Sequence, residues 1–593
     1  MCGIVGYIGN KKASLVVLEA LKNVEYRGYD SAGIAVLNSS IQIIKDVGKL
    51  AEIEKKHNFS SLEGTIGMGH TRWATHGGVN SMNAHPHTDE SGEICLVHNG
   101  IIENFQTLRE KLQKAGCKFR SETDTELMAH LISLELKKAK DFKGAFLSAL
   151  QKIEGSFSFV VMHKGEQKLY GARKSSPLII GVGKNEMFFA SDMPAVLSHT
   201  RDFVFLQENE AAEITKEGYE IYSLSGAKIS RAPTHVDWTP QMAQKEGYAH
   251  FMIKEISEQQ NSIRNVLATD VTSAAKLLKK SKYISIIACG TSYHAALLFK
   301  LRLANYGFRS DVVIGSEYST PPGSLQAQVV DKNTVVVAIS QSGETADTLS
   351  AVRFAKTKGA RIIGITNVIG SSLSREADSC IYTGAGPEIS VVATKSFTSQ
   401  VAILYMLAAV CAGENINEIK EKIRDLSAVI EAVISKDKEI NDISAELSKH
   451  EDFFFIGRGA AHPVAMEGAL KLKEITYLHA EAYAAGELKH GPLSLLEEGI
   501  PVIVIAPQNA GNVFKIISSI KECNARGAFI VGISDSDAVL EECNLKFKMP
   551  DCPTLFEAIA YTIPLQLLAY HMAIKLDKDP DKPRNLAKSV TVE

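Results

Sequence analysis

The chain has 593 residues, of which 45% are hydrophobic and 22% charged, and its formal net charge is -3. Because single hydrophobic cores stop growing at roughly 250 to 300 residues, we expect two to four domains. The nearly balanced charge gives no electrostatic case for nucleic acid, so small molecules or proteins are the expected partners.

The 9 cysteines are scattered and include no Cys-x-x-Cys pair, which predicts neither a disulfide framework nor a structural zinc site. The N-terminus lacks the basic and apolar regions of a signal peptide, and no later apolar run reaches the roughly 18 residues of a membrane span. We therefore expect a cytoplasmic protein without membrane contact. We expect no metal and no cofactor, because no metal-ligand cluster or dinucleotide fingerprint is present.

The first part of the chain has the pattern of an α+β domain. Few helical patterns occur there, chiefly at 14–23 and 123–137. The strand-like runs lie at 34–37, 95–98, 158–162 and 178–181. This mixture predicts antiparallel sheets over residues 2–215. Residues 216–245 are polar with little apolar periodicity, which predicts a linker.

From residue 246 onward, apolar runs alternate with long helical patterns, as in the βαβ units of a parallel sheet. Three segments of this part recur in the same order. The pairs are 283–290 with 452–459, 335–339 with 502–506, and 359–366 with 527–534, at offsets of 169, 167 and 168 residues. Three ordered matches at nearly one offset predict a duplicated, doubly wound α/β domain. Its copies are expected over 246–430 and 431–580, with a tail over 581–593.

The two copies differ where their strands end, which is where open α/β sheets bind ligands. Only the first copy has hydroxyl-rich turns at these points. These turns contain Thr291, Ser292, Ser340, Gln341, Ser342 and Thr345. Hydroxyls and backbone N–H groups at a helix N-terminus favour phosphate, so a phosphate site is expected in the first copy. The alternative is an ordinary turn capped by serine and threonine.

The second residue is a candidate nucleophile. If Met1 is removed, Cys2 carries its thiol beside a free α-amino group, whose ordinary pKa is about 8 and which can serve as its base. The alternative is that Cys2 merely follows the initiator. Polar motifs at His70–Gly77, Asn99–Gly100 and Ser121–Asp124 add further candidates beside the predicted strand ends.

The Cys2-Gly-Ile-Val-Gly6 start, Tyr26–Ser31, His70–Gly77 and His98-Asn-Gly100 resemble the class II glutamine amidotransferases. The resemblance implies an Ntn-hydrolase domain with αββα layers and Cys2 as its nucleophile. It also implies glutamine-binding and oxyanion-hole roles. Arg72 would hold the glutamine carboxylate and Asp124 its ammonium, Asn99 and Gly100 would form the oxyanion hole, and Trp73, Thr75 and His76 would complete the glutamine site, with Trp73 also gating an ammonia channel.

Each of these residues has an alternative interpretation. Arg72 could be a surface charge and Trp73 a core or interface indole. Asp124 could cap a helix, and Asn99–Gly100 could form a type I′ hairpin turn.

The second half resembles sugar isomerase (SIS) domains in Ala288–Ser292, Ser340–Asp347, Glu467–Glu474, His479–Pro492 and the C-terminus. The linked arrangement resembles the family of isomerising glutamine:fructose-6-phosphate aminotransferases over essentially the whole chain. In that family the residue matching Glu474 is the proton-transfer base and the one matching His490 assists ring opening. The lysine matching Lys471 supports the site, and the one matching Lys588 forms a Schiff base with the open-chain sugar.

Here too the residues allow other interpretations. Glu467, Lys471 and Glu474 have the i, i+4, i+7 spacing of a surface salt-bridge ladder. His490 could be an incidental loop histidine, and the polar tail carrying Lys588 could be a frayed terminus. One departure from the family is Ala393, which stands where family members often have serine.

The resemblance implies that L-glutamine and D-fructose 6-phosphate give D-glucosamine 6-phosphate and L-glutamate, the first step of hexosamine synthesis. It also implies an ammonia channel and a homodimer formed through the SIS domains. Three alternatives are an amidotransferase of the phosphoribosyl-pyrophosphate type, a sugar-phosphate sensor and a fructosamine-phosphate deglycase. The first would need an acidic run for magnesium-diphosphate, the second predicts loss of Cys2, Glu474 or Lys588, and the third would lack the first 240 residues.

Overall fold

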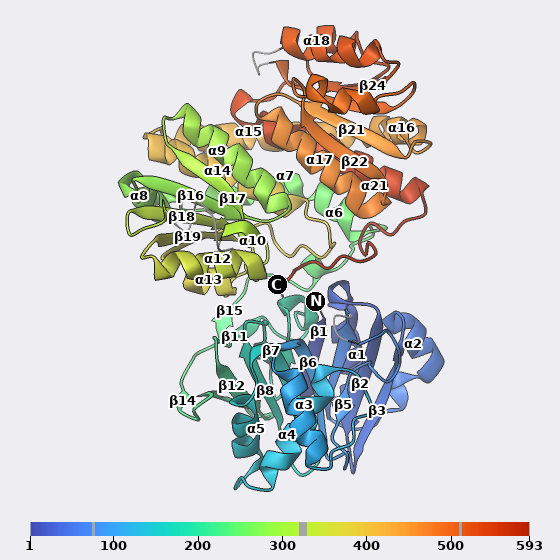
Figure 1. Ribbon diagram of the computed structural model, residues 1–593, viewed down its shortest axis with the longest axis vertical. Helices are drawn as coiled ribbons and strands as arrows, with labels where there is room; N and C mark the ends of the chain where they lie inside the picture. The colour runs from blue at the N-terminus through green and yellow to red at the C-terminus, as the bar shows by residue number, and fades with distance from the viewer. Residues whose placement is uncertain (1, 74–76, 319–328, 509–512, 592–593) are drawn as a thin grey trace. The chain divides into compact units, whose positions relative to one another are not determined.

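The computed structural model describes residues 2–73, 77–318, 329–508 and 513–591 (Figure 1). Its internal contacts divide the chain into two compact units. The first comprises residues 1–244 together with 587–593, and the second comprises residues 245–586.

The first unit is a sandwich of two antiparallel sheets. One sheet has eight strands in the order β15-β11-β9-β10-β1-β4-β2-β3. They are β1 (Gly3–Ile8), β2 (Ser31–Leu37), β3 (Ile41–Val47), β4 (Ile66–Arg72), β9 (Ile179–Val182), β10 (Met187–Ala190), β11 (Asp202–Phe205) and β15 (Thr234–His235). The other has seven, in the order β14-β13-β12-β8-β7-β6-β5. They are β5 (His87–Thr88), β6 (Ile94–Ile102), β7 (Gly155–His163), β8 (Leu169–Lys174), β12 (Glu210–Ile214), β13 (Tyr219–Ser223) and β14 (Lys228–Ile229).

Alternating side chains build the two cores of this unit. Val160 and Met162 of β7 face the core between the sheets, whereas Phe159 and Val161 face the helices on the other side. These helices are α3 (Phe105–Lys114), α4 (Asp124–Leu136) and α5 (Phe142–Leu150). Helix α1 (Ala13–Lys22) packs on β1 and β4, and α2 (Leu50–His57) packs on β2 and β3. The predicted αββα layers are therefore confirmed.

The segment expected to be a linker, 216–245, instead carries strands. β13 pairs with β12, β14 extends the same sheet, and β15 pairs with β11 of the other sheet. Strands β14 and β15 lie at sheet edges and give little apolar pattern in the sequence, because Lys228 and both residues of β15 are exposed. The first unit accordingly extends to Gln244.

The second unit contains two five-stranded parallel sheets with the same strand order. The first has the order β17-β16-β18-β19-β20 and the second β22-β21-β23-β24-β25. The strands are β16 (Tyr283–Ala288), β17 (Ser310–Ile314), β18 (Thr334–Ile339), β19 (Arg361–Thr366) and β20 (Ser379–Tyr382), then β21 (Asp452–Gly457), β22 (His479–Ala484), β23 (Pro501–Ala506), β24 (Phe529–Ser534) and β25 (Leu545–Lys548). The segments that repeat in the sequence are the three matching strands of each sheet, so the duplication is confirmed.

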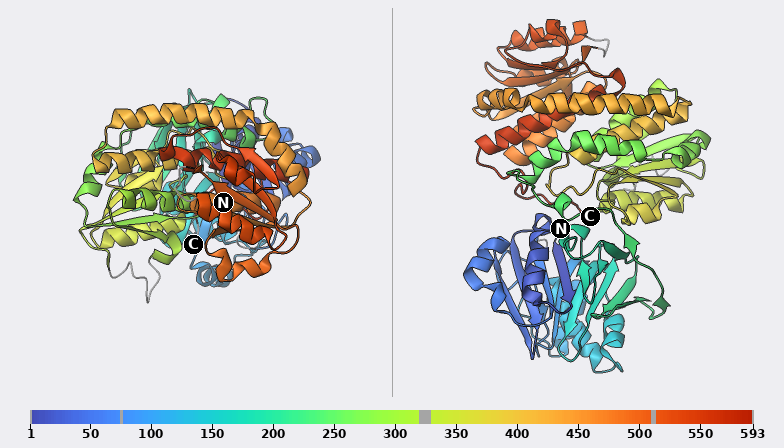
Figure 2. Two further views of the ribbon diagram at one scale, coloured as in Figure 1. Left: turned by 90° about the horizontal axis from the view of Figure 1, so that it is seen from above. Right: turned by 180° about the vertical axis from the view of Figure 1, so that it is seen from behind.

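Helices of both copies contribute to one continuous core. They include α6 (Phe251–Ser257), α7 (Gln259–Asn265), α8 (Thr272–Lys280), α9 (Thr291–Asn305), α14 (Lys395–Ala412), α15 (Ile416–Ser435), α16 (Asp437–Leu447), α17 (Ala461–Thr476) and α21 (Thr562–Lys575). Helix α15 contacts α7 and α14 as well as α21, and Figure 2 shows it running along both copies. The two copies thus form one structural body.

Other helices complete each copy. They are α10 (Gly315–Tyr318), α12 (Ala346–Thr357), α13 (Ser372–Glu376), α18 (Val513–Asn524), α19 (Asp537–Leu540) and α20 (Glu557–Ala560). By length and composition α14 could cross a membrane, but 89% of it is buried in the protein. It is the central helix of the first copy, and its apolar composition follows from that burial.

Candidate active site

The Cys2 thiol lies at the start of β1, half-buried beside the end of β4. Its Sγ accepts a hydrogen bond from the backbone N–H of Trp73 at 3.2 Å. Burial raises the pKa of the thiol, while the Trp73 N–H and the charges of Arg72 and Arg27 act in the opposite direction. A base is therefore needed to form the thiolate, which is the role that the sequence assigns to the free amine of Cys2.

Arg27 is a site residue to which the sequence analysis gave no role, although it lies in the Tyr26–Ser31 motif. Its Nε donates to the Cys2 carbonyl oxygen at 3.3 Å, and its Nη1 pairs with Asp192 at 2.8 Å. The Tyr26 hydroxyl donates to the same carboxylate at 2.7 Å. These contacts hold the backbone of Cys2 against the sheet.

Asn99 and Gly100 lie inside β6, opposite Ser158 and Phe157 of β7, so the hairpin-turn interpretation is wrong. The Asn99 Nδ2 donates to the Cys2 carbonyl oxygen at 2.9 Å. Gly100 has φ +132°, and a Cβ there would lie 2.1 Å from the Ser156 carbonyl oxygen, so the position requires glycine.

Asp124 begins α4 but does not cap it, because Thr123 occupies the N-cap position. Its Oδ2 accepts the backbone N–H of Ile102 at 2.9 Å, which ties the helix to the end of β6. The helix-cap interpretation is therefore wrong. The carboxylate is 5% exposed at one end of the strand that carries Asn99.

Arg72, at the end of β4, is 3% exposed, which contradicts the surface-charge interpretation. Its guanidinium donates to the carbonyl oxygens of Gly77 and Gly78, each at 3.2 Å. Burial lowers its pKa, and the charges of Cys2 and Asp124 raise it, so these three groups share one electrostatic environment. Thr75 and His76 lie outside the described residues.

In the second unit, the turn from 340 to 345 joins β18 to α12. The Ser340 Oγ accepts the Gly343 N–H at 3.1 Å and lies 2.9 Å from the Thr345 Oγ1. The Ser342 Oγ accepts the N–H of Glu344 at 3.2 Å. The Gln341 carbonyl oxygen accepts the N–H of Asn367 at 2.9 Å. The turn is thus a compact set of hydroxyls and amides before a helix, as an anion site requires.

Glu344 was also missed by the sequence analysis. It is 8% exposed, and its carboxylate accepts both the N–H and the hydroxyl of Ser372 at 2.8 Å. It therefore fastens the turn to the start of α13. Gly343 has φ +65°, and a Cβ there would lie 2.2 Å from the Ser371 Oγ, so only glycine fits the turn.

The i, i+4, i+7 residues of α17 form a buried cluster rather than a surface ladder. Glu467 and Lys471 are both 0% exposed. The Lys471 Nζ lies 3.3 Å from Glu467 and 2.7 Å from Glu474. Burial lowers the pKa of Lys471, but the two carboxylates outweigh it and raise that pKa overall. Lys471 is therefore an ammonium at neutral pH.

This cluster joins the two copies. The Lys471 Nζ donates to the Thr291 Oγ1 at 2.8 Å, and the Thr291 hydroxyl donates to Glu467 at 3.1 Å. The Glu467 carboxylate also lies 2.7 Å from the His294 Nδ1. Ser292 is 8% exposed and donates to Gln400 of α14 at 3.1 Å. Thr291 thus lies in the cluster, whereas the Ser292 hydroxyl turns to the helix core.

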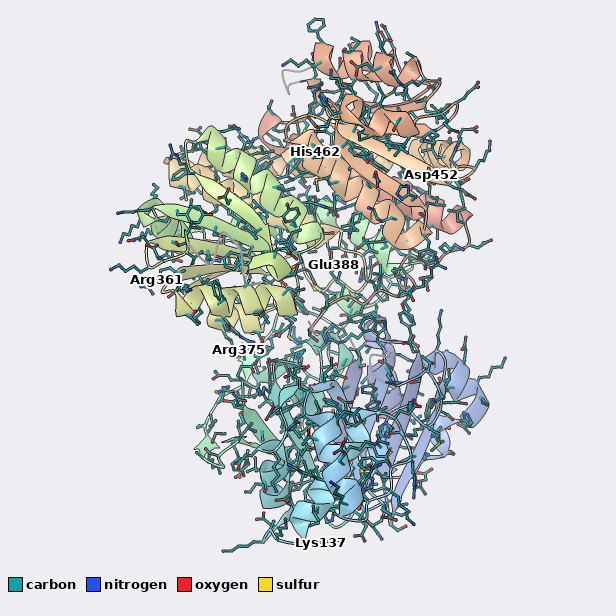
Figure 3. All side chains as sticks on the ribbon, in the orientation of Figure 1. Lys137, Arg361, Arg375, Glu388, Asp452 and His462 are labelled. Atoms are coloured by element: carbon teal, nitrogen blue, oxygen red, sulfur yellow. The ribbon has the colours of Figure 1, made fainter. Side chains whose placement is uncertain are left out.

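The segment before α14 contains Ala393 and is fixed by a buried carboxylate. Glu388, labelled in Figure 3, accepts the N–H groups of Thr394 and Ser396 at 2.9 and 3.0 Å and the Ser396 hydroxyl at 2.7 Å. The position of Ala393 is therefore set by the start of this helix.

His490 is exposed, and its imidazole makes no hydrogen bond within the described part of the chain. The beginning of the tail, by contrast, is firmly held. Asp581 is 5% exposed and accepts the N–H groups of Phe251 and Met252, each at 2.8 Å. Lys588 belongs to the last residues, which group with the first unit.

Comparisons with known proteins agree with this division. A glutamine amidotransferase domain model matches residues 70–198, and an SIS domain model matches residues 277–410 and 446–576. A solved structure described as the C-terminal domain of glucosamine-fructose-6-phosphate aminotransferase from Francisella tularensis is 37% identical, with a TM-score of 0.53. The matched region spans 57% of this chain and 99% of the chain in that solved structure.

The fold and the two sites define a class of protein: a glutamine amidotransferase joined to a duplicated SIS half. Two curated relatives cover 100% of both chains: the glutamine–fructose-6-phosphate aminotransferases (isomerizing) of Pyrococcus horikoshii, 47% identical, and Thermococcus kodakarensis, 45% identical. The chain belongs to the family of isomerizing glutamine–fructose-6-phosphate aminotransferases.

Proposed function

We propose that this chain converts D-fructose 6-phosphate and L-glutamine to D-glucosamine 6-phosphate and L-glutamate. The observation that carries the proposal is the presence, on one chain, of the Cys2 site and of the buried cluster around Lys471. The first site suits amide hydrolysis, and the second suits proton transfer on a sugar phosphate.

In the first half-reaction, the α-amino group of a processed Cys2 takes the thiol proton, and the thiolate attacks the glutamine amide carbon. The Asn99 Nδ2 and the Gly100 N–H stabilise the oxyanion that forms. Collapse releases ammonia and leaves a thioester, which water hydrolyses to glutamate and free thiol. Arg72 and Asp124 hold the α-carboxylate and α-ammonium groups of glutamine, with Trp73, Thr75 and His76 completing the site.

In the second half-reaction, the turn containing Ser340, Gln341, Ser342 and Thr345 binds the phosphate. His490 assists ring opening, and Lys588 forms a Schiff base with the open-chain ketose, releasing water. Ammonia displaces the lysine, and Glu474 moves a proton from C1 to C2 to give the 2-amino aldose. The Lys471 ammonium lies 2.7 Å from Glu474 and positions its carboxyl group for that transfer.

Ammonia must travel between the two reactions, because in water near pH 7 it would be protonated and lose its nucleophilicity. We infer a channel closed to solvent, with Trp73 as its gate. We also infer a cytoplasmic homodimer formed through the SIS domains. The exposed imidazole of His490 supports the dimer, since such a side chain could complete the site of a second copy.

The test is to measure glutamate and glucosamine 6-phosphate with each substrate alone and with both. We expect Cys2→Ala to lose glutamine use but to keep synthesis from added ammonia. An ammonia-dependent activity that also disappeared in this folded variant would contradict the assignment of two separate chemical sites.

A further inference from the structure

We propose that His70 is a positioning residue that orients the Asn99 side chain for catalysis at Cys2. The inference rests on the proposed hydrolysis of glutamine at Cys2 and adds a residue to it. His70 lies in the middle of the first unit, on β4 between β1 and β2, and is 0% exposed.

The hydrogen bonds determine where the imidazole proton lies. The His70 Nε2 is 3.0 Å from the Asn99 Oδ1 and 3.0 Å from the His98 carbonyl oxygen. Because the carbonyl oxygen can only accept, Nε2 must carry the proton. The Nδ1 atom has no hydrogen-bond partner among the described residues, and burial lowers the pKa of His70 to about 3. His70 is therefore a neutral imidazole that donates from Nε2.

This donor determines which way the Asn99 amide points. On the other side of the amide, Nδ2 donates to the Cys2 carbonyl oxygen at 2.9 Å. The two contacts agree, since an amide turned by 180° would place Nδ2 against the His70 N–H and Oδ1 against the Cys2 oxygen. Both pairs would then repel, and the oxyanion would meet an acceptor instead of a donor.

A second histidine holds the His70 ring in place. It stacks on the His85 ring with 4.1 Å between centroids, and the His85 Nε2 lies 2.8 Å from the Thr125 hydroxyl. That hydroxyl also lies 3.1 Å from the His98 Nδ1. Thr125 directly follows Asp124, so the packing that fixes the oxyanion donor is continuous with the residue proposed to hold the glutamine ammonium.

Substitutions of different length at position 70 test whether the N–H at Nε2 of the imidazole is needed to orient Asn99. Glutamine can place its Nε2 near that of histidine, whereas asparagine is too short and leucine has no donor. In the full-length enzyme we expect His70→Gln to retain most glutaminase turnover. We expect His70→Asn and His70→Leu to lower kcat by about 10- to 100-fold with little change in KM, because one oxyanion donor is worth about 10²- to 10³-fold.

A double-mutant comparison separates positioning from folding. If His70 acts through Asn99, His70→Leu should lower kcat in the wild-type background but add less than about twofold to Asn99→Ala. Equal losses in both backgrounds would overturn the proposal, as would equal activity of the glutamine and asparagine variants at position 70. Should the leucine variant fail to fold, the glutamine and asparagine pair still decides the question.

The same experiment keeps this inference apart from the proposed function. Glutaminase activity that survives both Cys2→Ala and Asn99→Ala would refute hydrolysis at Cys2 itself. Loss of activity in those two variants, with full activity in His70→Asn and His70→Leu, would refute only the role of His70.

An aldehyde analogue of glutamine forms a thiohemiacetal with Cys2. This analogue should bind His70→Leu more weakly than it binds the wild type, by the same factor as the fall in kcat. Inhibition by glutamate should change little.

Discussion

At the scale of single residues, the cluster proposed for the sugar site surrounds one buried cation. Lys471 is enclosed by Glu467 and Glu474 and hydrogen-bonds to Thr291 of the other copy. Buried ion pairs are costly to break, because the partner that remains is left charged and without compensation. Loss of Lys471 should therefore destabilise the fold and also release Glu474 from its position.

Replacement of Lys471 should lower both the stability of the second unit and the rate of amino-sugar synthesis. We expect Lys471→Met to destabilise the second unit by about 3 kcal/mol and to lower synthesis at least about 100-fold, since it leaves two carboxylates without their cation. Lys473→Met is the matched control, because Lys473 is an exposed lysine on the same helix. Urea unfolding and the rate of amino-sugar formation measure the two effects, and equal behaviour of the two variants would contradict this account.

The buried histidines of the first unit should make its stability depend on pH. Burial lowers the pKa of His70 to about 3, and it lowers the pKa values of His85 and His87 well below their ordinary range. In the unfolded chain these histidines titrate near pH 6.5, so below that pH the unfolded state binds protons that the folded state does not. Their stabilisation is complete above about pH 6.5 and is lost progressively as the pH falls towards 3.

Between pH 7 and 5.5 we expect about 1 kcal/mol of lost stability for each such histidine. The measurement is the urea midpoint of the first unit at both pH values, in the wild type and in His70→Gln. Between the two pH values, the urea midpoint should fall less in the variant than in the wild type. The difference should equal the contribution of one histidine. An identical decrease in both proteins would contradict the assignment of a neutral His70.

At the scale of elements, the turn proposed to bind phosphate is linked to a neighbouring helix. Parallel strands bring their carboxyl ends to one edge, and Glu344 links the turn after β18 to the start of α13. The turn is therefore already ordered in the structure, which would lower the entropic cost of the phosphate binding proposed for it.

Loss of this link should weaken sugar binding specifically. We expect Glu344→Gln to raise KM for fructose 6-phosphate about tenfold, because an amide cannot accept both Ser372 bonds as a carboxylate does. Glutamine hydrolysis measured without the sugar should be unchanged. Glu317→Gln, at an exposed glutamate of α10, is the control, and an equal KM in the two variants would show that the link does not position the turn.

The sequence predicted those elements whose patterns depend on burial. Repeated apolar strands such as Val335–Ile339 revealed the duplication, because strands covered on both faces must be apolar. The edge strands β14 and β15 were missed, since exposed strands need no such pattern. The spacing of Glu467, Lys471 and Glu474 is the same in a surface ladder and in a buried cluster, so only packing could distinguish them. Arg27 and Glu344 lie inside the quoted motifs, but the groups that they contact, such as the Cys2 carbonyl oxygen and the Ser372 N–H, cannot be read from the sequence.

At the scale of the whole molecule, the residues proposed for the two half-reactions lie largely on two different units. The first holds Cys2, and the second holds the Lys471 cluster. Lys588 groups with the first unit, although the reaction proposed for it belongs with the sugar. The tail that leads to it is anchored in the second unit through Asp581, so one continuous segment links the two sets of residues.

The most direct test follows glutamate release and glucosamine 6-phosphate formation together, from glutamine plus fructose 6-phosphate, in wild type, Cys2→Ala and Lys588→Ala. The account predicts equal amounts of both products from the wild type. It predicts no glutamate release by Cys2→Ala and no amino sugar from Lys588→Ala. Glutamate release by the wild type without any amino sugar would contradict it and leave a glutaminase with another acceptor.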